Sequence, residues 1–520
     1  MREEDEQILF EIQSTISKKS TQSHLKHTFF VPENTEQIYV DFSFDPPHQM
    51  DSIKNTRIIE EAFNYYESDL PTMDNEPVRN MLTLSIDDDD GFRGARHYHS
   101  PSQHVIVSEN NSTPGYLNKK NPTGLWSVTV SIHALVTEHC HINLCIYRKM
   151  QPSNDNNVLN LPWQSKPLTQ YVTENKLMIS SHSSEKKSMY WLPSELHTHT
   201  FHSDGKQSVL EMATVAKDMG LTTIVISDHN TISPLQDIEK AKEATGIQIL
   251  YGLEWTTFYG HMLTIGYKTP TYTDWRVIGP LNIEAGISEI RKHGALAGIA
   301  HPFRIGNPIG TGCHWEFPIE TMNSFDFIEV WNSVRPGSKA YNKRAFQFWT
   351  DLLNKGYKLT ATAGRDWHHN EQINPLPAIS YVRMPKTLAE EKDAFRSSFL
   401  SSIRSGKVSL SYGKPLELTI QQGEDVYTIG EVIDNKTERL CAQVHSEQWA
   451  SNERINKGSF RLLLFSNKGE LAHGSPGNLS LMNECETEGI RWIRAELYAS
   501  VDEEEIELIA FTNPVYFLEA

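Results

Sequence analysis

The sequence predicts a multi-domain fold in which a central α/β region is flanked on both sides by β-rich regions of sandwich type. Three observations support this fold class. The chain has 520 residues, more than one hydrophobic core normally organises. Strand and helix patterns alternate over about 200 residues in its middle part. Strand patterns predominate in the parts on either side.

The composition is that of an ordinary globular chain. Hydrophobic residues make up 38% and charged residues 22% of it, with a mean hydropathy of -0.47. The formal net charge of -18 repels polyanions, so nucleic-acid binding is not expected as a main activity. A small-molecule substrate fits this charge better.

No targeting or membrane segment is predicted. Residues 1–13 are acidic and lack the basic and apolar regions of a secretory signal, and no apolar run reaches about 18 residues. We therefore expect a cytoplasmic protein that does not span a membrane. Five scattered cysteines without a Cys-x-x-Cys pair argue against a disulfide framework and against a cysteine zinc site.

The N-terminal part divides into a short helical segment, a β-rich domain and a linker. We predict the helical segment over residues 1–24. A sandwich-like domain follows over residues 25–180, because alternating apolar residues mark strands at 38–44 and 125–132. Residues 181–190 are polar and rich in turn-forming residues, which predicts a linker.

The central domain is predicted over residues 191–405. Ser208 and Glu211 have the spacing of a capping box that opens a helix, and Gly220 stands where a C-terminal cap would end it. The alternation of strands and helices predicts a parallel, barrel-like sheet with functional groups at the carboxyl ends of its strands. The predicted strands are 221–226, 247–253, 262–267, 296–300, 327–330 and 358–363, with helices near 287–292 and 340–353.

The C-terminal part, residues 406–520, has a strand pattern without a helical signal. Its length is close to that of an immunoglobulin domain, which predicts an immunoglobulin-like β domain. The pattern of residues in this part does not point to any chemistry. Its predicted strands are 416–420, 440–444, 460–465, 492–497 and 506–511.

Metal-competent side chains recur in the central domain at the ends of predicted strands. His197 and His199 are two residues apart, so on an extended segment they point to the same side and can bind one ion. Each residue alone would more often be a structural histidine or a capping carboxylate, but their joint occurrence predicts a multinuclear metal site. The predicted ligands are His197, His199, Asp204, His229, Glu254, His261, His301, Asp366 and His368.

These residues carry a resemblance to a known family. Over roughly residues 190–400 the chain resembles the PHP (polymerase and histidinol phosphatase) superfamily. The motifs are, in order, His197-Thr-His199, Ser203-Asp204-Gly205, Ser227-Asp-His229, Gly252-Leu-Glu254, Ala300-His301-Pro and Asp366-Trp-His368. Within the superfamily, the flanking β domains and three short motifs most resemble the CehA/McbA-type metallohydrolases. These motifs are Gly260-His261, Ile328-Glu-Val-Trp-Asn332 and Thr512-Asn-Pro.

The resemblance implies a distorted (β/α)7 barrel that holds two or three divalent ions. The donor set leaves zinc, manganese and iron open. By motif position, a first ion would be held by His197, His199, Glu254 and Asp366. A second would be held by Glu254, His261 and His301, and a third by Asp204, His229 and His368. His202 and His369 adjoin these motifs and could either compete as ligands or lie behind them.

Hydrolysis is the reaction that such a centre favours. Closely spaced cations lower the pKa of a bound water and neutralise charge that develops on a phosphoryl or acyl oxygen. Two carboxylates are expected to be catalytic. Glu254 would be shared between ions, and Asp366 could orient the attacking water or accept its proton.

A substrate anion would need a cation besides the metals. Arg304 is the first choice, because it follows His301 by three residues, and Arg365 and Arg335 are weaker candidates. His314 and Trp315 lie in the stretch 306–318, whose glycines and prolines suit a pocket wall or a lid.

Three functions compete on the sequence. The first is a phosphoesterase that acts on a small phosphomonoester or phosphodiester. The second is a carboxyl ester, amide or carbamate hydrolase of CehA type, because the same activated water attacks acyl carbon. The third is a binding or scaffold protein with structural metals, which would favour closed coordination shells over sites open to water. The natural substrate stays open, and a homo-oligomer is compatible with the sequence.

Overall fold

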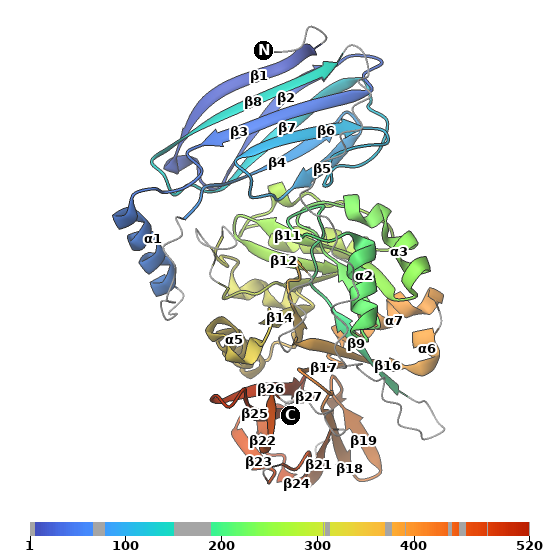
Figure 1. Cartoon of the computed structure of the whole chain (residues 1–520). Helices are drawn as coiled ribbons and strands as arrows, with labels where there is room; N and C mark the ends of the chain where they lie inside the picture. The colour runs from blue at the N-terminus through green and yellow to red at the C-terminus, as the bar shows by residue number, and fades with distance from the viewer. Residues whose placement is uncertain are drawn as a thin grey trace.

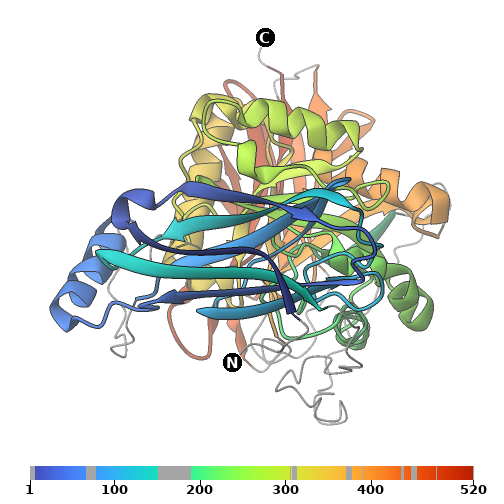
Figure 2. The ribbon, with the colours of Figure 1, turned by 90° about the horizontal axis from the view of Figure 1, so that it is seen from above.

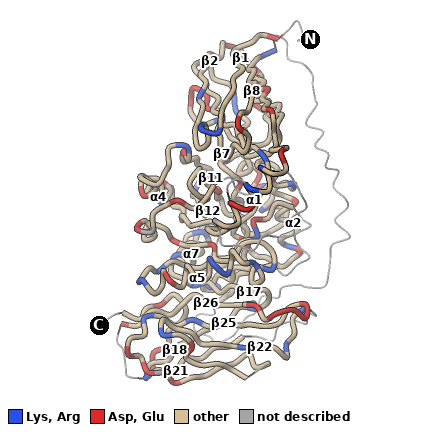
Figure 3. The backbone as a smooth tube through the Cα atoms, turned by 90° about the vertical axis from the view of Figure 1, so that its left-hand side faces the viewer, with Lys and Arg blue, Asp and Glu red and all other residues tan. Residues whose placement is uncertain are grey.

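The structure of the protein is a computed structural model. It describes residues 6–65, 78–149, 189–304, 306, 313–369, 377–390, 392–434, 439–446, 454–475 and 477–518. The elements stack in three layers, with the N-terminal strands above the central α/β region and the C-terminal strands below it (Figure 1). Lys and Arg are interspersed with Asp and Glu along the described chain (Figure 3). None of the described helices is long and apolar enough to cross a membrane.

The N-terminal layer is a sandwich of two antiparallel sheets. One sheet has the order β1 (Glu6–Ser17), β8 (His139–Lys149), β3 (Gln37–Asp45) and β6 (Ser102–Ser108). The other has the order β2 (Ser23–Val31), β7 (Gly124–Ala134), β4 (Met81–Asp88) and β5 (Gly91–Arg96). Apolar residues of both sheets, such as Phe42 and Val130, form one buried cluster between them. Viewed from above, these strands lie across the central region (Figure 2).

The prediction of a helical segment over residues 1–24 is wrong. Residues 6–17 form β1, which pairs with β8 from Glu6 opposite Lys149 to Ser17 opposite His139. The reason is visible in the sequence, since apolar residues stand at every second position from Ile8 to Ile12 and again at Ile16. A helix that the sequence did not predict, α1 (Ser52–Tyr65), follows β3.

Most of the predicted linker, residues 181–188, lies outside the described residues, as do residues 150–180 of the predicted sandwich domain. The chain is described again from Met189, where β9 (Met189–Glu195) begins. The central region therefore starts with a strand close to the predicted position.

The predicted alternation of strands and helices is confirmed in the central region. The strands after β9 are β10 (Thr223–Ile226), β11 (Gln248–Thr257), β12 (Gly260–Ile265), β13 (Leu296–Ile299), β14 (Phe327–Asn332) and β15 (Thr360–Gly364). The helices are α2 (Val209–Asp218), α3 (Ile238–Thr245), α4 (Ile283–Lys292), α5 (Ala340–Asn354), α6 (Lys386–Glu390) and α7 (Lys392–Arg404). The capping box is present, because Ser208 Oγ accepts from the Glu211 amide and the Glu211 carboxylate accepts from the Ser208 amide.

The prediction of a parallel sheet is wrong for one strand. β12 pairs antiparallel with both β11 and β13, whereas the pairs β9–β10, β10–β11, β13–β14 and β14–β15 are parallel. Only Phe258 and Tyr259 separate β11 from β12. A connection of two residues makes a hairpin, because a parallel pair needs a crossover of a dozen or more residues.

A closed barrel is not established by the pairing of these strands. The row from β9 to β15 follows sequence order, but β9 pairs with β16 (Ile379–Pro385) on its other edge. Among the described residues, the backbone pairing between the β15 end of the row and β9 is a parallel bridge just beyond the two strands, between Thr198 and Trp367. There, the Trp367 amide donates to the His197 carbonyl and the His199 amide donates to the Trp367 carbonyl. These bonds bring the first and last strand ends together.

The C-terminal layer continues the central sheet. β17 (Val408–Ser411) pairs with β16 on one side and with β26 (Ile506–Thr512) on the other. Beyond β26 lie β25 (Trp492–Val501), β22 (Ile455–Ser466) and β23 (Gly469–His473), with β20 (Val432–Ile433) and β27 (Val515–Phe517) beside them. A separate antiparallel sheet has the order β19 (Asp425–Thr428), β18 (Glu417–Gln422), β21 (Arg439–His445) and β24 (Ser480–Glu486).

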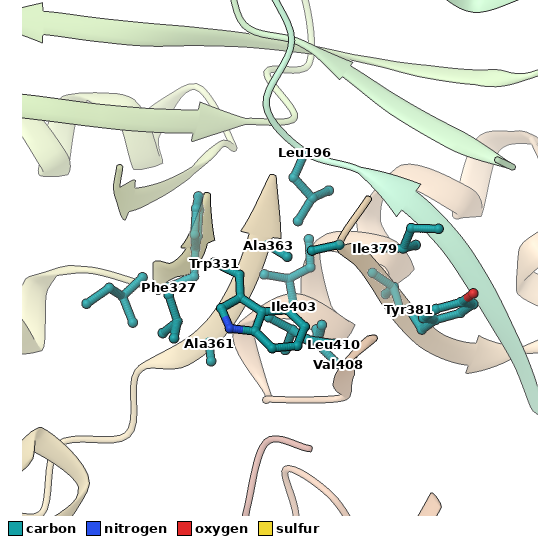
Figure 4. Close-up of a cluster of buried hydrophobic side chains, with 14 of the residues drawn as sticks. Leu196, Phe327, Trp331, Ala361, Ala363, Ile379, Tyr381, Ile403, Val408 and Leu410 are labelled. Atoms are coloured by element: carbon teal, nitrogen blue, oxygen red, sulfur yellow. The ribbon is translucent and has the colours of Figure 1, made fainter. Parts of the chain in front are cut away.

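Two features fasten the C-terminal layer to the central region. The Asn513 side chain accepts from the amide of Ala361 in β15 at 2.7 Å and donates to the carbonyls of Ala361 and Val408, each at 2.9 Å. The Trp331 ring of β14 packs against Phe511 and Tyr412, with centroids 4.9 and 5.3 Å apart. Figure 4 shows Trp331 among Phe327, Ala361, Ala363, Ile403, Val408 and Leu410.

We predict that Trp331→Ala destabilises the protein by about 3–5 kcal/mol. The Trp331 side chain is 1% exposed and fills the junction between β14 and the C-terminal strands, so its loss leaves a cavity. Urea unfolding followed by circular dichroism measures the change. Leu281→Ala is the control, because Leu281 is fully exposed and its truncation should change stability by less than about 0.5 kcal/mol. Equal stability of the two variants would contradict the packing of Trp331 against the C-terminal strands.

Candidate metal centre

The nine side chains that the sequence singled out lie together at one end of the central strands. Each one stands at or shortly after a strand, except Asp204, which comes from the turn before α2. Seven of the nine are buried, and Asp204 and His368 are partly buried. The strand order therefore brings together residues that are up to 171 positions apart, from His197 to His368.

The carboxylate of Glu254 is the point on which five histidines converge. It is fully buried in the middle of β11. Its Oε2 atom lies 3.1 Å from His197 Nε2, 3.2 Å from His199 Nε2 and 3.1 Å from His229 Nδ1. Its Oε1 atom lies 2.9 Å from His261 Nδ1 and 3.0 Å from His301 Nε2. Both oxygens are thus directed at imidazole nitrogens.

Two further carboxylates extend this cluster in the direction of His368. Asp366 Oδ1 lies 2.9 Å from His199 Nε2 and 3.3 Å from His197 Nε2. Asp204 Oδ1 lies 3.2 Å from His368 Nε2 and 3.6 Å from His229 Nε2. The possible ligand atoms fall into groups within 4.8 Å of one another. Two of these groups are His197, His199, Glu254 and Asp366, and His199, Asp204, His229 and His368.

The burial of these atoms fits divalent cations. Buried polar atoms normally make hydrogen bonds. Seven nitrogen and oxygen atoms at this site make none within the described part of the chain, although several of them lie 2.9 to 3.3 Å from one another in ion-pair contacts. They are His197 Nε2, His199 Nδ1, His199 Nε2, Asp204 Oδ1, Glu254 Oε2, His261 Nε2 and Asp366 Oδ1. Neutral imidazole nitrogens and carboxylate oxygens are ligands of zinc, manganese and iron. The residues present therefore suit metal ions.

One acidic residue of the site was missed by the sequence analysis. Glu329 lies in β14 and is fully buried. Its carboxylate faces His197 Nδ1 at 2.9 Å and accepts from the His301 amide at 3.0 Å, and with these two histidines it forms another possible ligand group. A carboxylate within the apolar sequence Phe327–Asn332 was the available signal, because charged residues are rarely buried without a partner.

The backbone around the site is tightly fitted. Gly364 ends β15, and a Cβ atom there would lie 2.5 Å from both Glu329 Oε1 and His197 Cβ. Asp366 and His301 have positive φ angles of 54° and 22°, which non-glycine residues rarely adopt. Such conformations persist only where the surrounding structure enforces them, and they are found often at functional sites.

Burial lowers the pKa of a histidine at this site, whereas a nearby carboxylate raises it. Burial disfavours the charged form of His197, but Glu329 and Glu254 outweigh it and raise its pKa to about 10. Burial dominates at His301 and lowers its pKa to about 4. The pKa of Glu254 is held well below its usual range, because the effect of nearby histidines exceeds that of burial.

The three candidate arginines have different surroundings. Arg304 reaches the site and forms an ion pair with Asp366. Arg365 does not face it, because its buried guanidinium pairs with Glu195 at 2.6 Å and stacks on Trp367. Arg335 pairs with Glu507 of the C-terminal layer. Arg304 is thus the one of these three that lies at the metal centre.

The two neighbouring histidines differ from the predicted ligands in position. His202 Nδ1 lies 2.7 Å from Ser233 Oγ, and its Nε2 faces Asp237 at 3.7 Å. His369 accepts from the Trp367 indole through its backbone carbonyl. Neither imidazole belongs to the possible ligand groups found among the described residues.

A pocket opens beside His261 and His301. Its wall includes His314 and Trp315, as predicted, although residues 307–312 of the predicted loop lie outside the described part of the chain. Gly260 permits this arrangement, because a Cβ atom there would lie 2.6 Å from the Trp315 ring. The full lining is Gly260, His261, Ala300, His301, Pro302, Arg304, Cys313, His314 and Trp315.

Two histidines of the N-terminal layer also reach the centre, and the sequence analysis missed them. His97 and His99 follow β5 directly. His99 Nε2 lies 3.5 Å from Asp204 Oδ2, and the His97 ring lies 4.5 Å from the His229 ring. The His-x-His spacing was the available signal, but it stands outside the region of alternating strands and helices.

A comparison with known protein families gives a match over the part of the chain that holds most of the predicted ligands. Residues 195–292 match the model of the PHP domain family. The matched segment contains six of the predicted ligands, from His197 to His261, and ends before His301. An uncharacterized protein of Methanocaldococcus jannaschii is 25% identical over 123 residues, which cover 22% of this chain and 68% of that protein.

Solved structures show weaker likenesses. A two-domain protein from Bacteroides vulgatus, described as containing a predicted PHP-like metal-dependent phosphoesterase, is 14% identical with a TM-score of 0.36. The match covers 65% of this chain and 99% of that one. A putative metal-dependent phosphoesterase from Bifidobacterium adolescentis is 16% identical with a TM-score of 0.26, over 39% of this chain and 94% of that one. At such TM-scores these likenesses do not establish a common fold.

We predict that Glu329→Gln weakens zinc binding by about 10- to 100-fold. The neutral amide no longer balances the charge of His197 or fixes its ring, and partners of this kind typically contribute that much to metal affinity. Competition with a chromophoric chelator measures the affinity. Glu320→Gln is the matched control, since Glu320 is exposed and belongs to none of the possible ligand groups found among the described residues. An unchanged zinc affinity of Glu329→Gln would show that Glu329 has no role in the centre.

We also predict that zinc affinity rises from about pH 7 to about pH 9. The pKa values of His197 and His261 are raised to about 10 in the metal-free protein, so both rings are protonated over this range. Binding zinc requires neutral imidazoles, so these protons must be released, and release becomes easier as pH rises. Calorimetry in buffers of different ionisation enthalpy measures the protons released. Binding heats that do not depend on the buffer would refute this account.

Proposed function

We propose that the protein is a metal-dependent hydrolase and, within that class, a phosphoesterase. The observation that carries the proposal is the convergence of five histidines on the buried Glu254 carboxylate, with Asp366 and Asp204 at its sides. The match of residues 195–292 to the PHP domain supports it. A structural metal site closes its coordination shell, whereas here a pocket opens beside His261 and His301.

The centre would hold two or three divalent ions. The ions would be shared among overlapping groups of possible ligands, which are His197, His199, Glu254 and Asp366; His229, Glu254 and His261; and His199, Asp204, His229 and His368. When bound, such ions activate water as a nucleophile and stabilise negative charge on the substrate. The row from β9 to β15 is proposed to be an incompletely closed form of the (β/α)7 barrel, and the CehA/McbA-like subgroup also remains a proposal.

The residues of the chain supply the remaining functions. Glu254 and Asp366 hold the imidazoles in place through contacts of 2.9 to 3.3 Å, and Asp366 is placed to accept a proton from an attacking water. Arg304 contacts Asp366 and lines the pocket, and its side chain is 37% exposed, so its guanidinium is available to a substrate anion there. Trp315 offers an apolar wall to a leaving group.

We predict that the protein, loaded with manganese or zinc, hydrolyses a bis-aryl phosphate and that Asp366→Ala lowers turnover by about 100-fold or more. Asp366 contacts both His197 and His199, so its removal should disturb the metal centre and the proton transfer together. The release of the aryl alcohol is measured by absorbance. Asp351→Ala, on the exposed surface of α5, should keep full turnover.

Other outcomes point to other substrates. If the wild type with metals bound leaves the diester uncleaved, phosphomonoesters become the leading candidate substrates. Hydrolysis of a carboxyl ester, amide or carbamate without any phosphate ester cleavage would contradict the phosphoesterase proposal and favour the CehA-type reaction. Metals bound without turnover of any of these substrates would favour a structural role.

A further inference from the structure

A second His-x-His segment meets the metal centre from the N-terminal layer. His97 and His99 follow β5, at the edge of the sandwich that lies next to the central region (Figure 1). They are two residues apart, as His197 and His199 are, and both reach Asp204. One possible ligand atom from each of His97, His99 and Asp204 lies within 4.8 Å of the others.

The contact between the two layers fixes this segment in place. Arg276 of the central region pairs with Asp87 of β4 through two bonds of 2.8 Å. Close to the segment, the Gly115 amide donates to Ser233 Oγ at 3.0 Å, and Thr231 Oγ1 donates to the Gly115 carbonyl at 2.6 Å. Gly115 is bonded to β5, because the Ala95 amide donates to its carbonyl at 3.1 Å, and its own amide also donates to His202 Nδ1 at 3.4 Å in the turn that carries Asp204. These contacts hold the end of β5 next to that turn.

Asp204 presents a different oxygen to each group of histidines. Its Oδ1 atom faces His368 and His229, at 3.2 and 3.6 Å. Its Oδ2 atom faces His99 Nε2 at 3.5 Å. A carboxylate in this orientation can bridge two cations, which the geometry of the Glu254 carboxylate also permits.

The surroundings of His97 also indicate a ligand. The residue is 3% exposed, and its Nδ1 atom is buried without a hydrogen-bond partner in the described part of the chain. The neighbouring cation, Arg96, stacks on the Tyr98 ring at 4.1 Å, and no ion pair between Arg96 and Asp204 is found among the described residues. His99 keeps 26% of its side-chain surface exposed, so an ion can enter from that side.

We propose that His97, His99 and Asp204 form an additional divalent-cation site between the N-terminal sandwich and the central region. Two imidazoles and one carboxylate, with open positions for water, make up a donor set that binds divalent transition metals. The sandwich would then complete the metal centre and be joined to it through a shared carboxylate. This site stands on its own geometry and does not depend on which bond the centre hydrolyses.

The test counts and locates zinc ions in the full-length protein. The wild type, His99→Ala and His104→Ala are stripped of metal, reloaded with zinc and freed of excess by gel filtration, and bound zinc is measured by mass spectrometry. His104 is the matched control, because it is an exposed histidine of β6 that contacts Asp41, away from the centre. His99→Ala should bind one zinc ion fewer per chain than the wild type, and His104→Ala should bind the same number.

Anomalous diffraction at the zinc edge then shows where the ion is lost. We expect a peak among His97, His99 and Asp204 in the wild type that is missing in His99→Ala, while the peak beside His229 and His368 remains. An equal zinc count in His99→Ala and the wild type overturns the proposal. Loss of the peak beside His229 and His368 instead also overturns it, because His99 would then act only by positioning Asp204. Both readouts are independent of hydrolysis, so they hold even if the proposed activity fails.

Discussion

Burial of the Glu254 carboxylate imposes the main constraint on this structure. A buried charge is costly unless it is paired, and here the pairing comes from five histidines at 2.9 to 3.2 Å. Those histidines follow or lie within β9, β10, β12 and β13, so the order of these strands must be kept for the carboxylate to be satisfied. The same arrangement leaves buried nitrogen atoms without partners, which divalent ions would satisfy.

The flanking layers act on this centre in different ways. The C-terminal layer extends the central sheet through β17 and supports the strands from below, with Asn513 bonded to β15 and Trp331 packed against Phe511. It places no described side chain among the possible ligand groups. The N-terminal layer, in contrast, brings His97 and His99 to the centre itself. The two β layers are therefore not equivalent, although their sequence patterns look alike.

Much of the central region could be predicted, because its signals are local. The capping box of Ser208 and Glu211 and the buried strands depend on residues close together in the chain. The two wrong predictions, of a helix in residues 1–24 and of an all-parallel sheet, also concern local signals, which were present in the sequence and were not used. Alternation in residues 8–16 marked β1 as a strand, and the two-residue gap before Gly260 marked the β11–β12 hairpin. Glu329 was overlooked because it lies inside a predicted strand, 327–330, whereas the predicted ligands all lie outside the predicted strands.

The sequence by itself determined which side chains can bind metals and that most of them lie at or near the ends of successive strands, because residue type and periodicity are properties of the chain. Only the tertiary structure decided their partners. Pairing of Arg365 with Glu195 and of Arg335 with Glu507 removed two candidate anion-binding residues, and docking of the sandwich placed His99 beside Asp204. Such contacts join residues far apart in the chain, and they depend on how the layers pack, which no local pattern encodes.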